Sequence, residues 1–188
     1  APMAAERVAR RRVFFAVWPD AAAARRLDDL GREAHARCGG RRMRRDGLHM
    51  TLAFIGEVPV ERLDELCAAA AGVAGEAFRL ELDRIACWRH NRIVWAGCAQ
   101  APLPLLTLVG RLRARLAAAG LPLDERDFAA HLTLLRDARC EDLPAFDPIA
   151  WPVGEFVLAA SRPEGGGNYD VIGRWALGAR GQGLGARG

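Results

Sequence analysis

Apolar positions along the chain change their spacing in an order that predicts a mixture of strands and helices. Continuous apolar runs and strict alternation indicate strands, and apolar residues three or four positions apart indicate helices. In chain order, the pattern predicts a strand at residues 13–18, a helix at 20–38, a strand at 48–55, a helix at 60–74, strands at 78–82 and 92–98, a helix at 102–119, and strands at 132–135, 153–161 and 169–177. Asp20 is expected to cap the first helix, and Gly56 to end the second strand.

Two stretches of the chain repeat the same order of strand, helix and strand. In the first, residues 13–18 and a helix precede His49, which opens the tetrapeptide HMTL. In the second, residues 93–98 and a helix precede His131, which opens HLTL. The histidine follows the start of its leading strand by 36 positions (13 to 49) in one stretch and by 38 (93 to 131) in the other. This repeat predicts two lobes related by a pseudo-two-fold axis.

The duplicated His-x-Thr motif predicts a cleft that carries out acid–base chemistry. Residues two apart on a strand face the same side, so His49 projects with Thr51 and His131 projects with Thr133. Phosphoryl transfer places the attacking and leaving oxygens on opposite sides of phosphorus, which suits one imidazole on each wall. The threonine hydroxyls are expected to donate hydrogen bonds to the non-bridging oxygens. This set needs no metal, and no cofactor is expected.

Two further residues extend the motifs by the same offset. Arg136, five positions after His131, is expected to bind the phosphate through two parallel hydrogen bonds. Strict alternation would turn Arg136 away, so the strand must end or bend after Leu134. Phe54 stands at the matching offset after His49 and is expected to stack on a nucleobase, with core packing as the alternative.

The other histidines and the cysteines do not suggest a second centre. No acidic residue or cysteine recurs at ligand spacing near either motif, which disfavours a two-histidine metal site. His35 and His90 are interpreted as structural or surface residues. The cysteines, none in a CxxC pair, are interpreted as small buried side chains of a protein from a reducing cytosol. They are Cys38, Cys67, Cys87, Cys98 and Cys140.

The chain has a formal net charge of +4, and all 27 of its basic residues are arginine. This charge fits a polyanion such as RNA, although a GC-rich coding sequence gives the same arginine bias. Arg42, Arg44 and Arg45 precede the first motif and are expected to steer RNA toward the cleft, with a solvated loop as the alternative. No apolar stretch is long enough to suggest a membrane span.

The motifs HMTLAFIG and HLTLLR, together with VFFAV, IVWAG and SRPEG, resemble the two-histidine phosphoesterase superfamily. Within it, the chain is most similar to the RNA 2′,3′-cyclic phosphodiesterases of the ThpR type, also called LigT-like 2′-5′ RNA ligases. The resemblance covers about residues 12–177. It implies a bilobal α+β fold in which two antiparallel sheets flank a central cleft with the helices outside.

The resemblance also implies roles for the site residues. His49 would be the general acid toward the O3′ leaving group, His131 the general base that activates water, and the product a 2′-phosphate end. Arg136 would hold the phosphate and Phe54 the terminal base. One departure is Ala130, where these proteins often carry proline before the second histidine.

The expected protein is a cytoplasmic monomer that acts on RNA with a 2′,3′-cyclic phosphate end. Residues 12–177 would form the phosphoesterase domain, with a flexible segment at 1–11 and a disordered Gly- and Arg-rich tail at 178–188. Ligation of 2′-5′ RNA and hydrolysis of a small cyclic nucleotide stay open, because they use the same acid–base pair. A non-catalytic RNA-binding module is the alternative from another class, and it would need neither motif histidine.

Overall fold

A computed structural model describes residues 8–178 of the protein. In it, a four-stranded antiparallel sheet contains the strand of the first histidine motif. Its strand order is β10-β9-β1-β3, and β1 is flanked by β9 and β3. The bounds are β1 (Arg10–Val17), β3 (Met50–Pro59), β9 (Glu155–Ser161) and β10 (Tyr169–Ala176). Residues 13–17 are buried, as the apolar run predicts for a strand inside a sheet.

A second four-stranded antiparallel sheet carries the second motif and has the order β2-β7-β6-β5. Its bounds are β2 (Arg41–Arg42), β5 (Arg84–Trp88), β6 (Ile93–Gly97) and β7 (His131–Arg136). A separate two-stranded antiparallel sheet pairs β4 (Phe78–Leu82) with β8 (Ile149–Val153).

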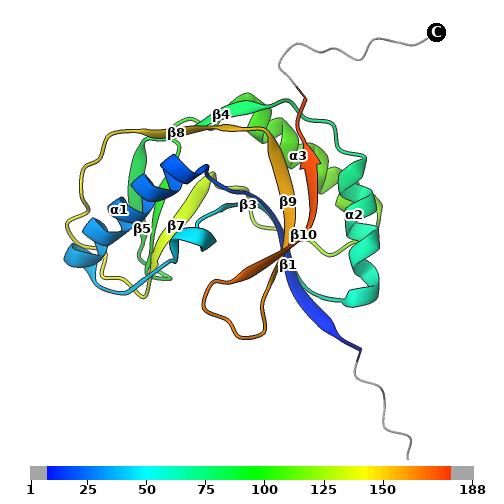
Figure 1. Ribbon diagram of the computed structural model, residues 1–188, viewed down its shortest axis with the longest axis horizontal. Coiled ribbons are helices and arrows are strands. Elements are labelled where there is room, and N and C mark those ends of the chain that lie inside the picture. The colour runs from blue at the N-terminus through cyan, green and yellow to red at the C-terminus, as the bar shows by residue number, and fades with distance from the viewer. Residues whose placement is uncertain (1–7, 179–188) are drawn as a thin grey trace, which may run out of the picture.

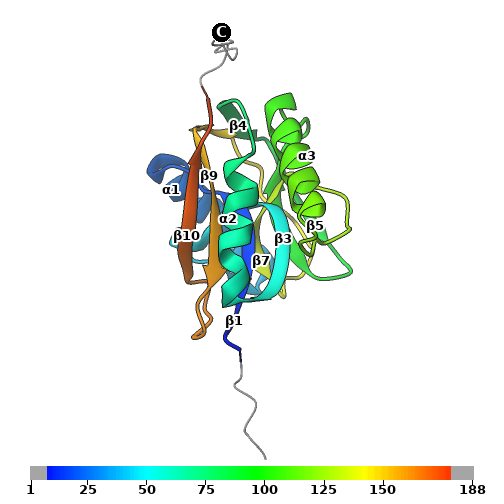
Figure 2. The same cartoon turned by 90° about the vertical axis from the view of Figure 1, so that its right-hand side faces the viewer.

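The helices lie at opposite ends of the molecule (Figure 1). They are α1 (Ala21–Cys38), α2 (Leu63–Ala71) and α3 (Leu103–Ala118), with 3-10 turns η1 (Arg45–Gly47) and η2 (Val60–Arg62). Asp20 caps α1 as predicted, because its side chain accepts a hydrogen bond from the Ala23 backbone N–H at 2.8 Å. Figure 2 shows α2 in front of the first sheet with α3 beside it.

The predicted repeat is confirmed, and its two halves are interleaved. The strands that bracket α1, β1 and β3, pair antiparallel, and so do the strands that bracket α3, β6 and β7. However, α1 packs against β7 of the second sheet, and α3 contacts β3 of the first. Each half therefore covers part of the other, and the bilobal α+β architecture that the sequence predicts is confirmed.

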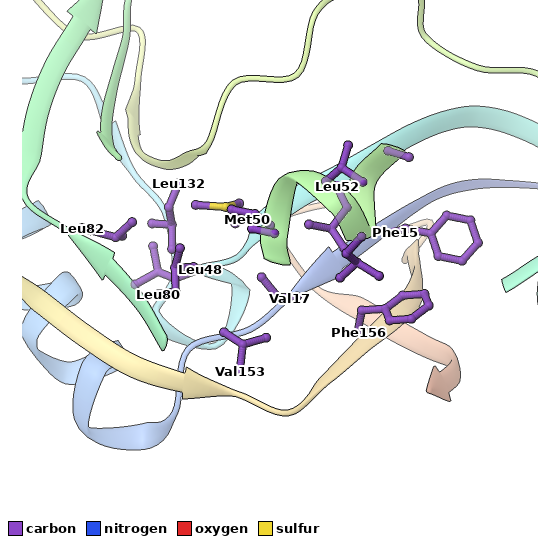
Figure 3. Packing of buried hydrophobic residues seen from close by; sticks show 14 of the residues in the cluster. Phe15, Val17, Leu48, Met50, Leu52, Leu80, Leu82, Leu132, Val153 and Phe156 are labelled. Carbon is purple, nitrogen blue, oxygen red and sulfur yellow. The ribbon is translucent and has the colours of Figure 1, made fainter. Parts of the chain in front are cut away.

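One continuous core joins the two sheets (Figure 3). Met50 and Leu52 from the first motif strand pack in it together with Leu132 from the second, and each is at most 1% exposed. Burying an apolar side chain of this size contributes roughly 1.5–3 kcal/mol. These buried apolar residues of the motif strands hold the strand backbone in place. The residues that alternate with them project to the opposite face of each sheet, away from this core.

Several boundaries differ from the prediction. Gly56 does not end β3, which continues to Pro59, because Gly56 adopts a φ of 92° beside an irregularity in the β1–β3 pairing. The predicted strand at 153–161 is β9, which begins at Glu155, and β8 just before it was not predicted. The strands β2 and β5 were not predicted, because neither shows a clear alternation.

The cysteine prediction is wrong for one pair. Cys87 and Cys140 form a disulfide, with their Cα atoms 5.6 Å apart, a separation ordinary for such a bond. Cys38 is free and buried, while Cys67 and Cys98 are free and half-buried. The expectation of a reducing cytosol was based partly on cysteines that form no disulfide, and this bond weakens that expectation.

The ends of the expected domain are also adjusted. Arg10 and Arg11, assigned to a flexible lead-in, belong to β1. Gly178, assigned to the tail, forms a β-bridge with Glu76. Residues 1–7 and 179–188 of the two expected terminal segments lie outside the described residues. Among residues 8–178, no helix is both long and apolar enough to cross a membrane.

Candidate active site

The two sheets enclose a cleft of about 490 Å³ that contains both motif histidines, here called the histidine cleft. The six residues that the two motifs singled out all line it: His49, Thr51, Phe54, His131, Thr133 and Arg136. The prediction that the two motifs share one cavity is confirmed.

Both histidines are held by the same backbone contact. His49 Nδ1 lies 2.7 Å from the Gly47 carbonyl oxygen, and His131 Nδ1 lies 2.8 Å from the Ala129 carbonyl oxygen. A carbonyl only accepts, so each Nδ1 carries the proton and donates it. The Nε2 atom of each ring is then the one that gains or loses a proton, and it is the atom left for substrate.

A local irregularity in each motif strand brings the third motif residue to the same side. In β7, Val94 pairs with Leu135 and Trp95 with Thr133, so Leu134 is an extra residue without a partner. Leu134 and Leu135 are consequently both buried, and Arg136 returns to the face of His131. The predicted bend after Leu134 is thus a bulge within the strand.

The first motif has the matching irregularity. Ala16 pairs with Thr51 and Phe15 with Ala53, so Leu52 is the extra residue of β3. Leu52 and Ala53 are both buried, and Phe54 therefore reaches the histidine cleft with Thr51. The two bulges explain why a spacing of three residues, which a regular strand would place on opposite faces, serves one site.

Aromatic side chains that the sequence analysis did not assign to the site surround each histidine. The ring of His49 is stacked on Phe14 and Trp18, with centroids 4.7 and 4.8 Å away, and Tyr169 meets it edge-on at 5.2 Å. Trp88 lies 4.5 Å from the ring of His131. Alternation along β1 places positions 14 and 16 on one face and would have indicated Phe14, but nothing in the sequence indicates Tyr169 or Trp88.

These surroundings favour the neutral form of both imidazoles. Burial lowers the pKa of His49 to about 4, against the Gly47 hydrogen bond that raises it, and the charges of Arg136 and His131 lower it further. Burial likewise lowers the pKa of His131, with Arg136 and Arg126 adding to the effect. A bound anion would raise both values, because it favours the charged imidazolium.

Arg136 is the cation that both histidines share. Its charge adds to the burial that lowers the pKa of His49 and of His131, and it opposes the burial that raises the pKa of Tyr169, so the guanidinium lies near all three. Within residues 8–178, it makes no ion pair with a carboxylate. Its guanidinium is therefore available to an anion in the cleft.

Phe54 is held from one side by a second cation that the sequence analysis missed. The guanidinium of Arg12 lies 5.0 Å from the centre of the Phe54 ring, close enough for a cation–π contact. Phe54 is half-buried against the Phe14 cluster and also lines the cleft, so it takes part in packing, and stacking on a nucleobase stays a prediction.

The arginine loop before the first motif is ion-paired within the protein. Arg42 and Arg45 donate to the carboxylate of Asp28 on α1, at 2.7 and 3.0 Å, and Arg44 pairs with Asp46. Asp28 is buried, and these contacts fix the η1 turn that supplies the Gly47 carbonyl. The geometry assigns this loop a structural role, and RNA steering by its arginines stays a prediction.

The segment before the second motif is fixed from α3 and β3. Arg113 donates to the Asp124 carbonyl at 2.7 Å, and the Asp124 N–H donates to the Phe54 carbonyl at 3.2 Å. Arg126 lines the cleft beside this segment and pairs with Asp124. In the described part of the chain, no three His, Cys, Asp or Glu side chains gather as a metal site would require.

Comparison with known proteins identifies close relatives. The family model described as LigT like Phosphoesterase matches residues 17–95. The chain is 39% identical over 142 residues to the RNA 2′,3′-cyclic phosphodiesterase of Escherichia coli strain K12, covering 73% of this chain and 80% of that protein. A relative of the same name from Geobacillus stearothermophilus is 31% identical over 156 residues, covering 73% of this chain and 49% of the relative.

Solved structures agree with the sequence matches. The crystal structure of E. coli LigT complexed with 3′-AMP superposes with a TM-score of 0.79 at 34% identity, covering 90% of this chain and 99% of that one. The structure of TT0787 from Thermus thermophilus matches with a TM-score of 0.71 at 25% identity, with the same coverage.

Proposed function

The chain belongs to the LigT-like phosphoesterase family, and we propose that it hydrolyses 2′,3′-cyclic phosphate ends of RNA to 2′-phosphomonoesters. Two imidazoles, each with Nδ1 bound to a backbone carbonyl, share one cleft with Arg136, which has no carboxylate partner among residues 8–178, and this observation carries the proposal. The curated relatives named RNA 2′,3′-cyclic phosphodiesterase support the same activity.

The reaction requires one proton to leave and one to arrive at opposite sides of phosphorus. His131 Nε2 accepts a proton from water as the water oxygen bonds to phosphorus. His49 Nε2 donates a proton to O3′ as the bond between phosphorus and O3′ breaks. The product has a 2′-phosphate and a free 3′-hydroxyl, and the histidines exchange their protons with solvent before the next turnover.

The low pKa of His49 makes its role as the acid depend on substrate. At neutral pH the free protein holds His49 mostly neutral, because its pKa lies at about 4. The negative charge of the cyclic phosphate favours the imidazolium and raises this pKa on binding. Protonation of the acid is thereby coupled to occupancy of the cleft.

The remaining cleft residues hold the substrate. Thr51 and Thr133 donate hydrogen bonds to the non-bridging oxygens, and Arg136 binds the phosphate through its paired N–H groups. Phe54, held on one face by Arg12, offers its other face to the terminal base. All the groups named for the reaction are side chains, so the proposed reaction needs no metal, and the protein is proposed to act as a monomer.

Histidine variants and chelation test this function together. His49→Ala and His131→Ala should each lower kcat by about 10²–10⁴-fold on an RNA with a cyclic phosphate end, because each removes one proton transfer. His35→Ala, on the exposed face of α1, is the matched control and should retain activity. EDTA should leave the wild-type rate unchanged.

Two outcomes would contradict the proposal. Activity that is lost on chelation and restored by a divalent ion would mean that a metal performs the proton or charge chemistry. A protein that binds the RNA tightly but never converts it would instead be the non-catalytic RNA-binding module.

A further inference from the structure

A second cavity of about 560 Å³ lies next to the histidine cleft, here called the upstream cavity. Trp18 and Tyr169 stand between the two, because both rings contact His49 and both line the upstream cavity. The residues of this cavity that carry the argument are Trp18, Val157, Asn168, Tyr169, Val171 and Arg174. None of them was singled out for a site by the sequence motifs.

The two cavities lie along one face of the first sheet. Phe14 and Ala16 of β1 form a small apolar cluster with Val157 and Ala159 of β9, and Phe54 and Tyr169 pack against it. Phe54 lines the histidine cleft and Val157 lines the upstream cavity. A ligand that leaves the histidine cleft across β1 and β9 therefore enters the upstream cavity.

The lining of the upstream cavity suits a nucleobase. Trp18 and Tyr169 provide aromatic surface, and Val157 and Val171 provide apolar surface beside it. The Asn168 side chain makes no hydrogen bond to any other described residue, so its amide is free to donate to and accept from a base edge.

The outer part of the cavity carries mixed charge. Arg162 and Arg174 pair with Asp170 and Glu155, and their side chains remain 51% and 59% exposed. Each guanidinium has five N–H donors and uses only part of them in its pair, which leaves donors for one phosphate. Carboxylates at the same rim disfavour a long polyanionic track, so the cavity suits a single nucleotide.

We propose that the upstream cavity binds the nucleotide that precedes the reactive end of the RNA, a proposal that rests on the function proposed above. The centroid of Trp18 lies 4.8 Å from that of His49. Trp18 therefore lies directly beside the ring that faces the reacting phosphate, and it also lines the upstream cavity. When the terminal nucleotide occupies the histidine cleft, the base before it reaches Trp18 and Tyr169, its edge meets Asn168, and its phosphate lies near the rim arginines.

This arrangement makes the protein select an oligonucleotide over a cyclic mononucleotide. Stacking of one base on aromatic side chains corresponds to at least about a fivefold gain in kcat/KM when it is retained in the transition state. The gain should come from the first added nucleotide and should need its base. Further nucleotides should add little.

Three substrates measure this gain: adenosine 2′,3′-cyclic phosphate, a dinucleotide that ends in the same group, and that dinucleotide without its first base. Wild type should hydrolyse the intact dinucleotide with at least about fivefold higher kcat/KM than the other two. Val171→Glu, which introduces a carboxylate into the cavity, and Asn168→Ala should both reduce the ratio of dinucleotide to mononucleotide kcat/KM. Val60→Glu is the matched control, because Val60 is 41% exposed against 43% for Val171 and lies on η2 outside both cavities.

The outcomes separate the two proposals. If wild type hydrolyses the mononucleotide but gains nothing from the first base, the upstream cavity is not a nucleotide site while the proposed function stands. A ratio that falls equally in Val171→Glu and Val60→Glu would also overturn the cavity assignment. If wild type hydrolyses none of the three substrates, the proposed function fails and the cavity assignment fails with it.

Discussion

Burial of His49 should make the folding free energy depend on pH in a way that a single substitution removes. Its pKa falls from 6.5 to about 4 in the folded protein, because burial disfavours the charged ring. The folded state thus holds the proton less tightly than the unfolded chain does. The stabilising contribution is fully present above pH 6.5, and it is lost as the pH falls toward 4.

The size of the effect follows from the shift. Each pKa unit corresponds to about 1.36 kcal/mol, so a fall from 6.5 to about 4 corresponds to about 3 kcal/mol. His49→Asn removes the titrating ring. Between pH 7.5 and pH 4, the wild type should therefore lose about 3 kcal/mol more unfolding free energy than the variant.

Urea denaturation of both proteins at several pH values measures the difference. His35→Asn is the control, because His35 lies exposed on α1, and it should follow the wild-type pH dependence. Parallel curves for wild type and His49→Asn would refute the reasoning, since they would mean that the folded protein binds the His49 proton as readily as the unfolded chain.

Three further predictions concern the cleft and its support. Arg136→Lys keeps the charge but should lower kcat/KM at least about tenfold, because lysine cannot form two parallel hydrogen bonds with the phosphate. Steady-state kinetics measures this, and an unchanged kcat/KM would argue against bidentate binding. Asp28→Asn should lower the unfolding free energy by about 1–3 kcal/mol in urea titrations, because Arg42 and Arg45 lose a charged acceptor, whereas the exposed Asp29→Asn should have little effect. The kcat/KM profile should be bell-shaped with its maximum below pH 6.5, since burial lowers both histidine pKa values, and a maximum above pH 7 would contradict this.

The sequence predicted the parts of the site that depend on local periodicity. His49 and Thr51 share a face because alternation holds between them, and the repeat at His131 indicated the second wall of the cleft. Strict alternation would place Phe54 and Arg136 on the opposite face from the histidines. They reach the cleft because the bulges at Leu52 and Leu134 shift the alternation by one residue. A bulge depends on the pairing with the neighbouring strand, which the motif strand itself does not specify.

Contacts between distant segments were the parts that could not be predicted. Asp28 and Arg45 stand 17 positions apart, and only the fold shows that α1 holds the turn that orients His49. Tyr169 reaches His49 from the last strand, and Cys140 reaches Cys87 across 53 positions. Each of these pairs is set by tertiary packing, and no spacing rule in the sequence indicates it.

The identity of the product end tests the proposed reaction most directly. Purified protein is incubated with an RNA that ends in a 2′,3′-cyclic phosphate, and ³¹P NMR identifies the phosphomonoester that forms. If His49 protonates O3′, the product is a 2′-phosphate with a free 3′-hydroxyl. A 3′-phosphate would mean that the bond to O2′ breaks instead, and an unchanged cyclic phosphate would mean that the histidine pair does not hydrolyse this substrate.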